Sequence, residues 1–283
     1  MTDLNGSPPD WGEYAAIQRA MHQILDDPRI FADPLAVRII GADAESRLRI
    51  NLAQFEKTRE RGLRAYMAVR NRYAEDELAR SISGGFRQYV ILGAGLDTFA
   101  YRNPFSSLRV FEVDHPATQE WKRRQLENAA IPIPASAIFV PVDFGRQVAI
   151  DVLGQHGFKG DNHAFVAWLG VTRYLTREAV IGVLTSLRSS LRSESKIVVD
   201  FFPPSLKQRV HQGTRQALAD WRFKRNGFRP TYLDSVSFIH DIKRIGFSDV
   251  QILGSREMNA RYCGERTDGL RVPDQPCLVK VRV

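Results

Sequence analysis

The stretch QYVILGAGLDT, residues 88–98, decides the fold of this chain. A short apolar run ends at Leu92, and Gly93 and Gly95 follow it directly. Glycines after a buried parallel strand allow the backbone to turn tightly and to approach a ligand without a Cβ in the way. The same pattern is typical of a plain strand–helix connection, and of a dinucleotide site. A dinucleotide site normally has a third glycine where this chain has Thr98, so a ligand without a pyrophosphate fits the pattern better.

Beyond this stretch, short apolar runs alternate with helical segments. The runs are rich in Val, Ile and Phe and are continuous, which is typical of parallel strands buried on both faces. Expected strands lie at 88–92, 109–113, 138–142, 164–169 and 196–202, and expected helices at 116–128, 147–155 and 177–191. Two last runs, 249–253 and 277–283, have no convincing helix between them and are expected to pair antiparallel at one sheet edge. The sequence therefore predicts an α/β fold with a Rossmann-like seven-stranded methyltransferase-type sheet, mostly parallel, with a reversed C-terminal edge pair.

The N-terminal part has a helical pattern instead. Residues 11–25 and 54–82 carry apolar side chains at helical spacing, and glycines follow the second segment as in a helix C-cap. We expect residues 1–83 to form a helical cap on a core of residues 84–283, in a single compact unit. Residues 203–234, polar and helical in pattern, and residues 254–276, a long loop in pattern, are expected to be lid segments over the substrate.

Acidic residues end the next two expected strands. Asp114 ends the second strand, and Asp143, followed by Phe144, closes the third. An acid at the first position can accept hydrogen bonds from both ribose hydroxyls of a nucleoside. An acid at the second can accept one from an adenine amino group, and a phenylalanine can pack on the base. Taken singly, Asp114 is also compatible with a helix cap and Asp143 with an ordinary loop acid; the three strand ends together favour a nucleoside ligand.

A family resemblance becomes specific at this point. The segment VRNRYAEDELARSISGGFRQYVILGAGLDTFAYR, residues 69–102, followed by VFEVDHP, VPVDF and GVTRYLT, resembles the leucine carboxyl methyltransferase-like family of bacterial O-methyltransferases. The resemblance covers about residues 15–200 well and the remainder more loosely. It implies a class I methyltransferase fold and S-adenosyl-L-methionine as the methyl donor.

The resemblance also implies cofactor contacts at particular positions. These are Arg70, Gly93, Ala94, Gly95, Asp114, Asp143, Phe144 and Leu169. The glycine stretch would flank the methionine part, Asp114 would take the ribose, and Asp143 with Phe144 the adenine. Arg70 lies on the apolar stripe of its helix and would pair with the carboxylate of the cofactor, for which a guanidinium is well suited. The alternative for Arg70 is a structural salt bridge to a protein acid. Arg19 is a weaker candidate for a second cationic contact.

The chain departs from the family pattern at Leu169. The family usually has a glutamate before the glycine of E-G-(V/L)-x-x-Y-L, where it would face the amino group of the cofactor. Leucine removes this charged acceptor, so we expect cofactor binding to be weaker by about ten- to a hundredfold. Arg173 is a second departure, since an apolar residue is common there. It would either pair with an acidic substrate or point to solvent.

Charge, apolar runs and cysteine content indicate which partners to expect. The net charge of +8 is compatible with nucleic-acid binding, but the arginines are spread along the chain and no aromatic-rich nucleic-acid pattern accompanies them, so nucleic acid is not the expected partner. The apolar runs fall far short of the ~20 residues of a membrane span, and the polar first residues do not resemble a signal peptide. Cys263 and Cys277 lack metal-site spacing and are expected to be reduced thiols. We expect a soluble, cytoplasmic enzyme with no metal site.

The reaction is predicted from its chemistry. Methyl transfer from a sulfonium is an in-line displacement that requires alignment and exclusion of water. A carboxylate acceptor is already ionised, whereas a hydroxyl needs a base, and no compelling base stands out. By position only, Arg173, Tyr174 and His115 are the catalytic candidates. We therefore expect O-methylation of a carboxylate or acidic hydroxyl of a small molecule. The alternatives are an RNA-modifying methyltransferase, suggested by the charge, and a cofactor-binding protein without catalysis, suggested by Leu169.

Overall fold

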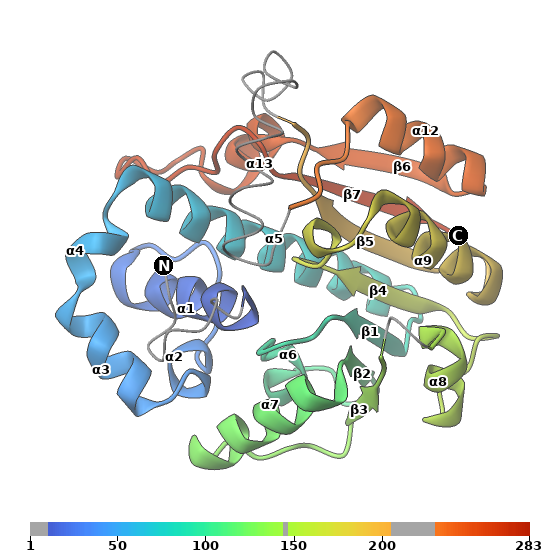
Figure 1. The fold of residues 1–283 in the computed structure, drawn as a ribbon, viewed down its shortest axis with the longest axis horizontal. Helices are drawn as coiled ribbons and strands as arrows, with labels where there is room; N and C mark the ends of the chain where they lie inside the picture. Colours follow the sequence, from blue (N-terminus) through green and yellow to red (C-terminus); the bar gives the residue numbers. More distant parts are fainter. Residues whose placement is uncertain (1–10, 144–146, 205–229) are drawn as a thin grey trace.

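The computed structural model describes residues 11–143, 147–204 and 230–283. Within these ranges, seven strands form one sheet with helices on both sides (Figure 1). The strands are β1 Gln88–Leu92, β2 Arg109–Asp114, β3 Ala137–Pro141, β4 Ala164–Trp168, β5 Lys196–Phe201, β6 Ser248–Leu253 and β7 Cys277–Arg282. The helices are α1 Trp11–Leu25, α2 Ala36–Ile39, α3 Ala42–Ile50, α4 Leu52–Phe55, α5 Thr58–Ser83, α6 Phe99–Arg102, α7 Pro116–Asn128, α8 Ala149–Gln155, the 3-10 turn η1 Thr172–Tyr174, α9 Arg177–Ser190, α12 Ser235–Ile245 and α13 Ser255–Tyr262.

The strand order is β3-β2-β1-β4-β5-β7-β6, which confirms the predicted methyltransferase-type sheet. β1 is parallel to β2 on one side and to β4 on the other. β7 is inserted between β5 and β6 and runs antiparallel to both. The chain crosses from one half of the sheet to the other between β1 and β4, and open α/β sheets bind ligands at such a switch point, outside the carboxyl ends of the strands. The fold therefore places the ends of β1, β2 and β4 where a ligand is expected.

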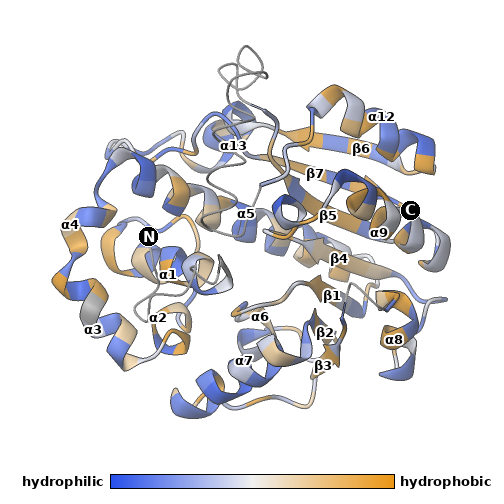
Figure 2. Cartoon of the chain, viewed as in Figure 1, coloured by the Kyte–Doolittle hydropathy of each residue, from blue (hydrophilic) through white to orange (hydrophobic). Residues whose placement is uncertain are grey.

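The two faces of the sheet are covered by different helices. β1 is buried along its whole length, and its side chains alternate between the two faces. On one face, Tyr89 and Ile91 share a hydrophobic cluster with Tyr66 and Val69 of α5. On the other face, Val90 shares a cluster with side chains of α8, α9 and α12. In Figure 2 the strands are mostly hydrophobic, whereas α7 and α12 show many hydrophilic residues on their outer sides.

The N-terminal helices surround the edge of the β1–β2 region. α1 to α4 pack around a third hydrophobic cluster, which includes Met21 of α1, Ile39 of α2 and Leu126 of α7. α5 belongs to the core of the sheet instead, because its apolar side chains lie in the same cluster as those of β1, β4 and β5. α1 packs on α5 and so reaches the cavity side of the sheet (Figure 1).

The C-terminal region differs from the sequence prediction. The prediction of a loop over 254–276 was wrong for its first part, because α13 occupies Ser255–Tyr262. The carboxylate of Glu257 accepts the backbone N–H of Gly254 at 3.1 Å, which supports the first turn, and Met258 is fully buried. A single strongly buried apolar side chain is a weak sequence signal for a helix of this length. Most of the expected lid over 203–234 lies outside the described residues.

Both cysteines are free thiols, and burial raises the pKa of each, to about 11 for Cys277. Because the thiolate is the reactive form, neither is poised as a nucleophile. In the described ranges, no helix has both the length and the apolar character needed to cross a membrane.

Candidate active site

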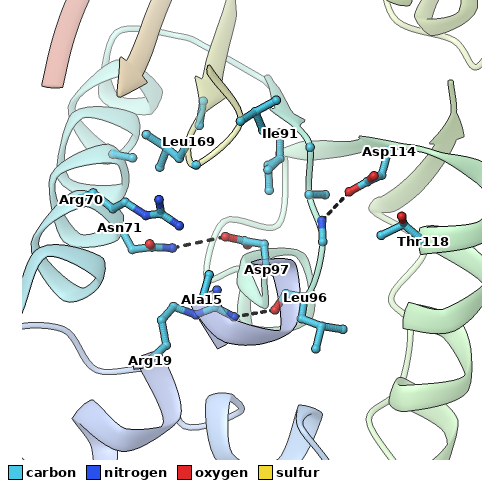
Figure 3. Close-up of a pocket in the computed structure, with 18 of the residues that line it drawn as sticks. Ala15, Arg19, Arg70, Asn71, Ile91, Leu96, Asp97, Asp114, Thr118 and Leu169 are labelled. Carbon is cyan, nitrogen blue, oxygen red and sulfur yellow. Dashed lines mark hydrogen bonds between the residues drawn. The ribbon is translucent and has the colours of Figure 1, made fainter. Parts of the chain in front are cut away.

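A cavity of about 410 Å³ opens at the carboxyl ends of β1, β2 and β4, at the switch point of the sheet. Its walls are the loop after β1, the end of β2 with the start of α7, and the segment after β4, together with one side of α1 and one side of α5 (Figure 3). A cavity of this size lies in the range of sites for small molecules and cofactors.

The glycine loop after β1 forms one wall. Gly93 has a φ of +70°, and a Cβ there would lie 2.3 Å from Cγ2 of Val171. A side chain at this position is therefore excluded both by the backbone conformation and by the segment after β4. The backbone N–H of Gly95 donates to Oδ2 of Asp114 at 2.6 Å, so the loop is held against the end of β2 (Figure 3).

At the end of β2, Asp114 holds the glycine loop and His115 caps α7. The other oxygen of Asp114, Oδ1, accepts the backbone N–H of His115 at 2.7 Å. Nδ1 of His115 accepts the backbone N–H of Ala117 at 3.3 Å and so caps α7. Asp114 lines the cavity and His115 does not. The helix-capping role that the sequence left open for Asp114 belongs to its neighbour.

Arg70 projects from α5 toward the segment after β4. Its Nη1 donates to Oδ2 of Asp200 at 3.1 Å, and Asp200 also accepts the hydroxyl of Tyr66 and the backbone N–H of Gly170. A Cβ on Gly170 would lie 2.8 Å from Nη1 of Arg70, so the guanidinium packs directly on this glycine. Nε of Arg70 has no hydrogen-bond partner among the described residues. The salt bridge to a protein acid is present, and it uses only part of the guanidinium.

Two further polar residues of this wall are Asn71 and Asp97. Nδ2 of Asn71 donates to Oδ2 of Asp97 across a long 3.4 Å contact, and Oδ1 of Asp97 accepts the backbone N–H of Phe99 at 2.8 Å. Glu75, one turn further along α5, lines the cavity too, and its two oxygens accept hydrogen bonds from Arg102. Burial raises the pKa of Glu75 to about 7 although Arg102 opposes this, and the charge of Asp97 adds to the rise.

The segment after β4 forms the neighbouring wall of the cavity, where Val171 packs against Gly93 of the glycine loop. Leu169, Val171 and the half-exposed Tyr174 line it. Arg173 is not among the lining residues. Its guanidinium lies over the ring of Phe202 at 4.3 Å from the centroid and near that of Tyr232 at 5.7 Å.

Comparison with known proteins identifies this arrangement. The family model described as leucine carboxyl methyltransferase matches residues 13–188, which include the glycine loop, Asp114 and the segment after β4. The chain belongs to the leucine carboxyl methyltransferase family. A Bacillus subtilis (strain 168) relative, YktD, provisionally named an S-adenosyl-L-methionine-dependent methyltransferase, is 32% identical over 284 residues, or 90% of this chain and 91% of YktD.

Other relatives agree with this assignment. A Mycolicibacterium smegmatis protein with the same provisional methyltransferase name is 29% identical over 247 residues, covering 80% of this chain and 77% of its own. The crystal structure of a duf574 family protein from Streptomyces avermitilis superimposes with a TM-score of 0.53 at 14% identity, covering 94% of this chain and 96% of that one. This second likeness shows the fold alone. The family member described here is an S-adenosyl-L-methionine-dependent methyltransferase, with S-adenosyl-L-methionine as its cofactor.

The cavity of this leucine carboxyl methyltransferase family member fits such a cofactor. Gly93 leaves the loop free of side chains where the cofactor would lie, and the partly unpaired guanidinium of Arg70 is available to a carboxylate. Asp114 ends β2 beside the loop, as a ribose acceptor would.

Most of the predicted site residues come together here. The positions predicted to contact the cofactor that line the cavity are Arg70, Gly93, Ala94, Gly95, Asp114 and Leu169. Asp143 is not among the lining residues, and its backbone N–H donates to Oε1 of Gln147 at 2.9 Å. Phe144 lies outside the described residues. Of the catalytic candidates, Tyr174 lines the cavity, whereas Arg173 and His115 do not.

Sequence reasoning missed other lining residues. Asn71 and Glu75 lie on the same side of α5 as Arg70, and Asp97 lies within the glycine stretch itself. An acid four positions after Gly93 was a usable signal, because the loop it belongs to was already expected to touch the ligand. Arg19 was not missed: it was the weaker candidate for a second cationic contact, and it lines the cavity, where its Nη2 donates to the carbonyl of Leu96 (Figure 3).

Proposed function

We propose that this methyltransferase binds its cofactor along the ends of β1 and β2 and transfers the methyl group to an oxygen atom of a small molecule, either a carboxylate or an acidic hydroxyl. The cavity size and the absence of side chains at Gly93 and Gly95 support the first part. The second part rests on the chemistry of the wall after β4.

The cofactor roles follow from the lining. Arg70 would bind the methionine carboxylate through the donors that Asp200 leaves open. Asp114 would accept the ribose hydroxyls, since it lies at the end of β2 on the cavity wall, where the N–H of Gly95 holds one carboxylate oxygen beside the glycine loop. Asp143 and Phe144 are proposed to contact the adenine on the strength of the family resemblance.

The residues that line the cavity after β4 are the basis for the proposed class of methyl acceptor. Leu169, Val171 and Tyr174 line it, and no histidine or lysine occurs among the described residues that line the cavity. The carboxylates of the lining lie on α5 and at the ends of β1 and β2 instead. A hydroxyl of ordinary pKa needs a base within hydrogen-bond reach, whereas a carboxylate or an acidic phenol is ionised at neutral pH. This wall therefore favours an acceptor that arrives already ionised.

The residues of the chain would position the cofactor and exclude water from the reacting atoms. The bound cofactor supplies a methyl group on a positively charged sulfur, and the acceptor oxygen takes it as the carbon–sulfur bond breaks. Arg70 and the glycine loop would fix the cofactor, which converts the step into an oriented in-line displacement. The apolar side chains of Leu169 and Val171 would keep water from the reacting atoms. Tyr174, at the mouth, is proposed to contact the acceptor.

Labelling in a cell extract tests the proposal. The purified enzyme is incubated with methyl-labelled cofactor and an extract separated into small molecules, protein and RNA, and labelled products are identified by mass spectrometry. We expect the label in the small-molecule fraction on oxygen, as a methyl ester that mild base cleaves to methanol or as an aryl methyl ether. The matched control is Asp114→Ala, which should lower labelling at limiting cofactor, because a lost hydrogen bond to a charged acceptor weakens binding by ~1–3 kcal/mol.

Other distributions of label would contradict the proposal. Label on nitrogen or carbon would exclude O-methylation, and nuclease-sensitive label would favour an RNA substrate. Tight binding of S-adenosylhomocysteine with no labelled product in any fraction would favour a binding protein without catalysis.

A further inference from the structure

The methionine end of the cofactor sets a requirement that the proposed contacts do not meet. An α-amino acid carries a carboxylate and an ammonium group on one carbon, so its site needs a cation and an acceptor close together. Arg70 provides the cation. Leu169, beside the Gly170 on which Arg70 packs, offers no side-chain acceptor for the ammonium group. A buried ammonium group without an acceptor is strongly unfavourable, and a carboxylate elsewhere in the wall would be the strongest acceptor for it.

Three carboxylates line the cavity, those of Glu75, Asp97 and Asp114. Glu75 and Asp114 already have other hydrogen-bond partners or lie far from Arg70. Both oxygens of Glu75 accept hydrogen bonds from the guanidinium of Arg102. Asp114 accepts backbone N–H groups through both oxygens and lies beyond the glycine loop next to Thr118, away from Arg70 (Figure 3).

Asp97 is differently placed. Its Oδ1 accepts the N–H of Phe99 at 2.8 Å, which fixes the side chain at the start of α6. Its Oδ2 accepts only the long 3.4 Å contact from Asn71 among the described hydrogen bonds, a distance at which such a bond is weak. Figure 3 shows Asp97 between Asn71 and the glycine loop, with Arg70 adjacent to Asn71 on α5. The cation and the open acceptor thus lie on the same side of the cavity.

The surroundings of Asp97 show that its charge is poorly balanced. It forms no ion pair within the described part of the chain. Burial is the main cause of the raised pKa of Glu75, and the negative charge of Asp97 adds to it. The same charge contributes to the raised pKa of Tyr89, also after burial. A cation bound beside Asp97 would relieve this unfavourable potential.

We propose that Asp97, held in place by the N–H of Phe99, accepts the ammonium group of the cofactor and takes the place of the acidic acceptor that Leu169 does not provide. Arg70 and Asp97 then form a matched pair of opposite charges for the zwitterion. The proposal rests on the cavity being the cofactor site. It also replaces the expectation of weak binding drawn from Leu169 alone, because the charged acceptor is moved to another element and is not lost.

Calorimetry with three ligands separates ammonium binding by Asp97 from a general effect of the residue on cofactor affinity. The ligands are S-adenosylhomocysteine, its analogue without the α-amino group, and 5′-methylthioadenosine, which lacks the amino-acid part. Asp97→Asn removes the charge and keeps an acceptor for the N–H of Phe99. We expect it to weaken S-adenosylhomocysteine binding about ten- to a hundredfold and to leave the other two ligands within about twofold of the wild type.

Glu75→Gln is the matched control, since it neutralises another carboxylate of the same wall. It should affect S-adenosylhomocysteine and the amino-free analogue equally. Selective loss in Glu75→Gln, or equal or no loss for the two ligands in Asp97→Asn, would overturn the role of Asp97. If Asp97→Asn does not fold, Asp97→Ser provides the same test with the turn acceptor retained. Failure of the wild type to bind any of the three ligands would instead overturn the cofactor site.

Discussion

Two buried arginines of α5 are used differently. Arg64, near the start of the helix, is fully buried and donates to both oxygens of Asp26 and to the carbonyl of Phe55. Arg70, at the middle of the helix, donates to Asp200 alone among the described residues, and its Nε has no partner there. Arg64 has its donors satisfied by the protein, which is the mark of a structural group. Arg70 keeps unused donors at a cavity wall, which is the mark of a group that binds a ligand.

The environment of Asp26 strengthens the contrast. Nε2 of His22 accepts the backbone N–H groups of Ile30 and Phe31, so Nδ1 carries the hydrogen that is donated to Asp26 at 2.7 Å. Burial alone would raise the pKa of Asp26, yet the hydrogen bonds from His22 and Arg64 hold it below the usual 3.8. The network ties α1 to α5 and has no group left over for a ligand.

The largest expected effect is therefore on stability, in the first half of α5. Asp26→Asn should lower the free energy of unfolding by ~3–5 kcal/mol, because it leaves the buried Arg64 with only the longer 3.4 Å ion pair to the more exposed Glu56. The measurement is urea denaturation of the ligand-free protein. Because the folded pKa of Asp26 is lowered, its contribution is present above about pH 4 and is lost as the pH falls through the folded value, so the difference between variant and wild type should narrow in acid. A loss below about 1 kcal/mol at neutral pH would contradict the structural role.

The second effect is on binding, at Arg70 in the middle of α5. Arg70→Gln should weaken S-adenosylhomocysteine binding by ~1.5–3 kcal/mol, the range for a charge-assisted hydrogen bond. Its effect on unfolding should be smaller than that of Asp26→Asn, because Asp200 keeps the hydroxyl of Tyr66 and the N–H of Gly170. Arg72→Gln, which removes an exposed arginine paired with Asp76 on the same helix, is the control and should leave affinity unchanged. Equal losses in the two variants would mean that only the overall charge matters.

The smallest expected effect concerns Glu75, further along α5. Its pKa is raised to about 7, chiefly by burial. A carboxyl group with a raised folded pKa contributes stability that is full below its ordinary value and is lost as the pH rises through the folded one. The free energy of unfolding of the ligand-free wild type should thus fall by about 2 kcal/mol more than that of Glu75→Gln between about pH 5 and pH 8. Parallel stability curves for the two proteins would show that Glu75 titrates normally.

The same contrast explains how far the sequence could predict the molecule. The strand ends were predictable because their signals are local: Gly93 needs a left-handed turn without a Cβ, and Asp114 ends a buried strand. Arg64 and Arg70 look alike in the sequence, since both are charges on the buried side of one helix, and only tertiary packing gives one of them Asp26 and the other Asp200.

Other misses have the same cause. The roles of Asn71 and Asp97 depend on how α5 lies across the end of β1, and no local pattern reports that crossing. The short helices α2, α3 and α4 were not assigned because each depends on packing in the third cluster more than on its own periodicity. α13 was hidden by the glycines around it.

A crystal structure with bound S-adenosylhomocysteine tests the central claim most directly. The account predicts the ligand in the cavity at the ends of β1, β2 and β4, with its carboxylate on Arg70, its ammonium group on Asp97 and its ribose hydroxyls on Asp114. A ligand bound elsewhere, or bound in this cavity with its amino-acid part turned away from Arg70 and Asp97, would contradict it.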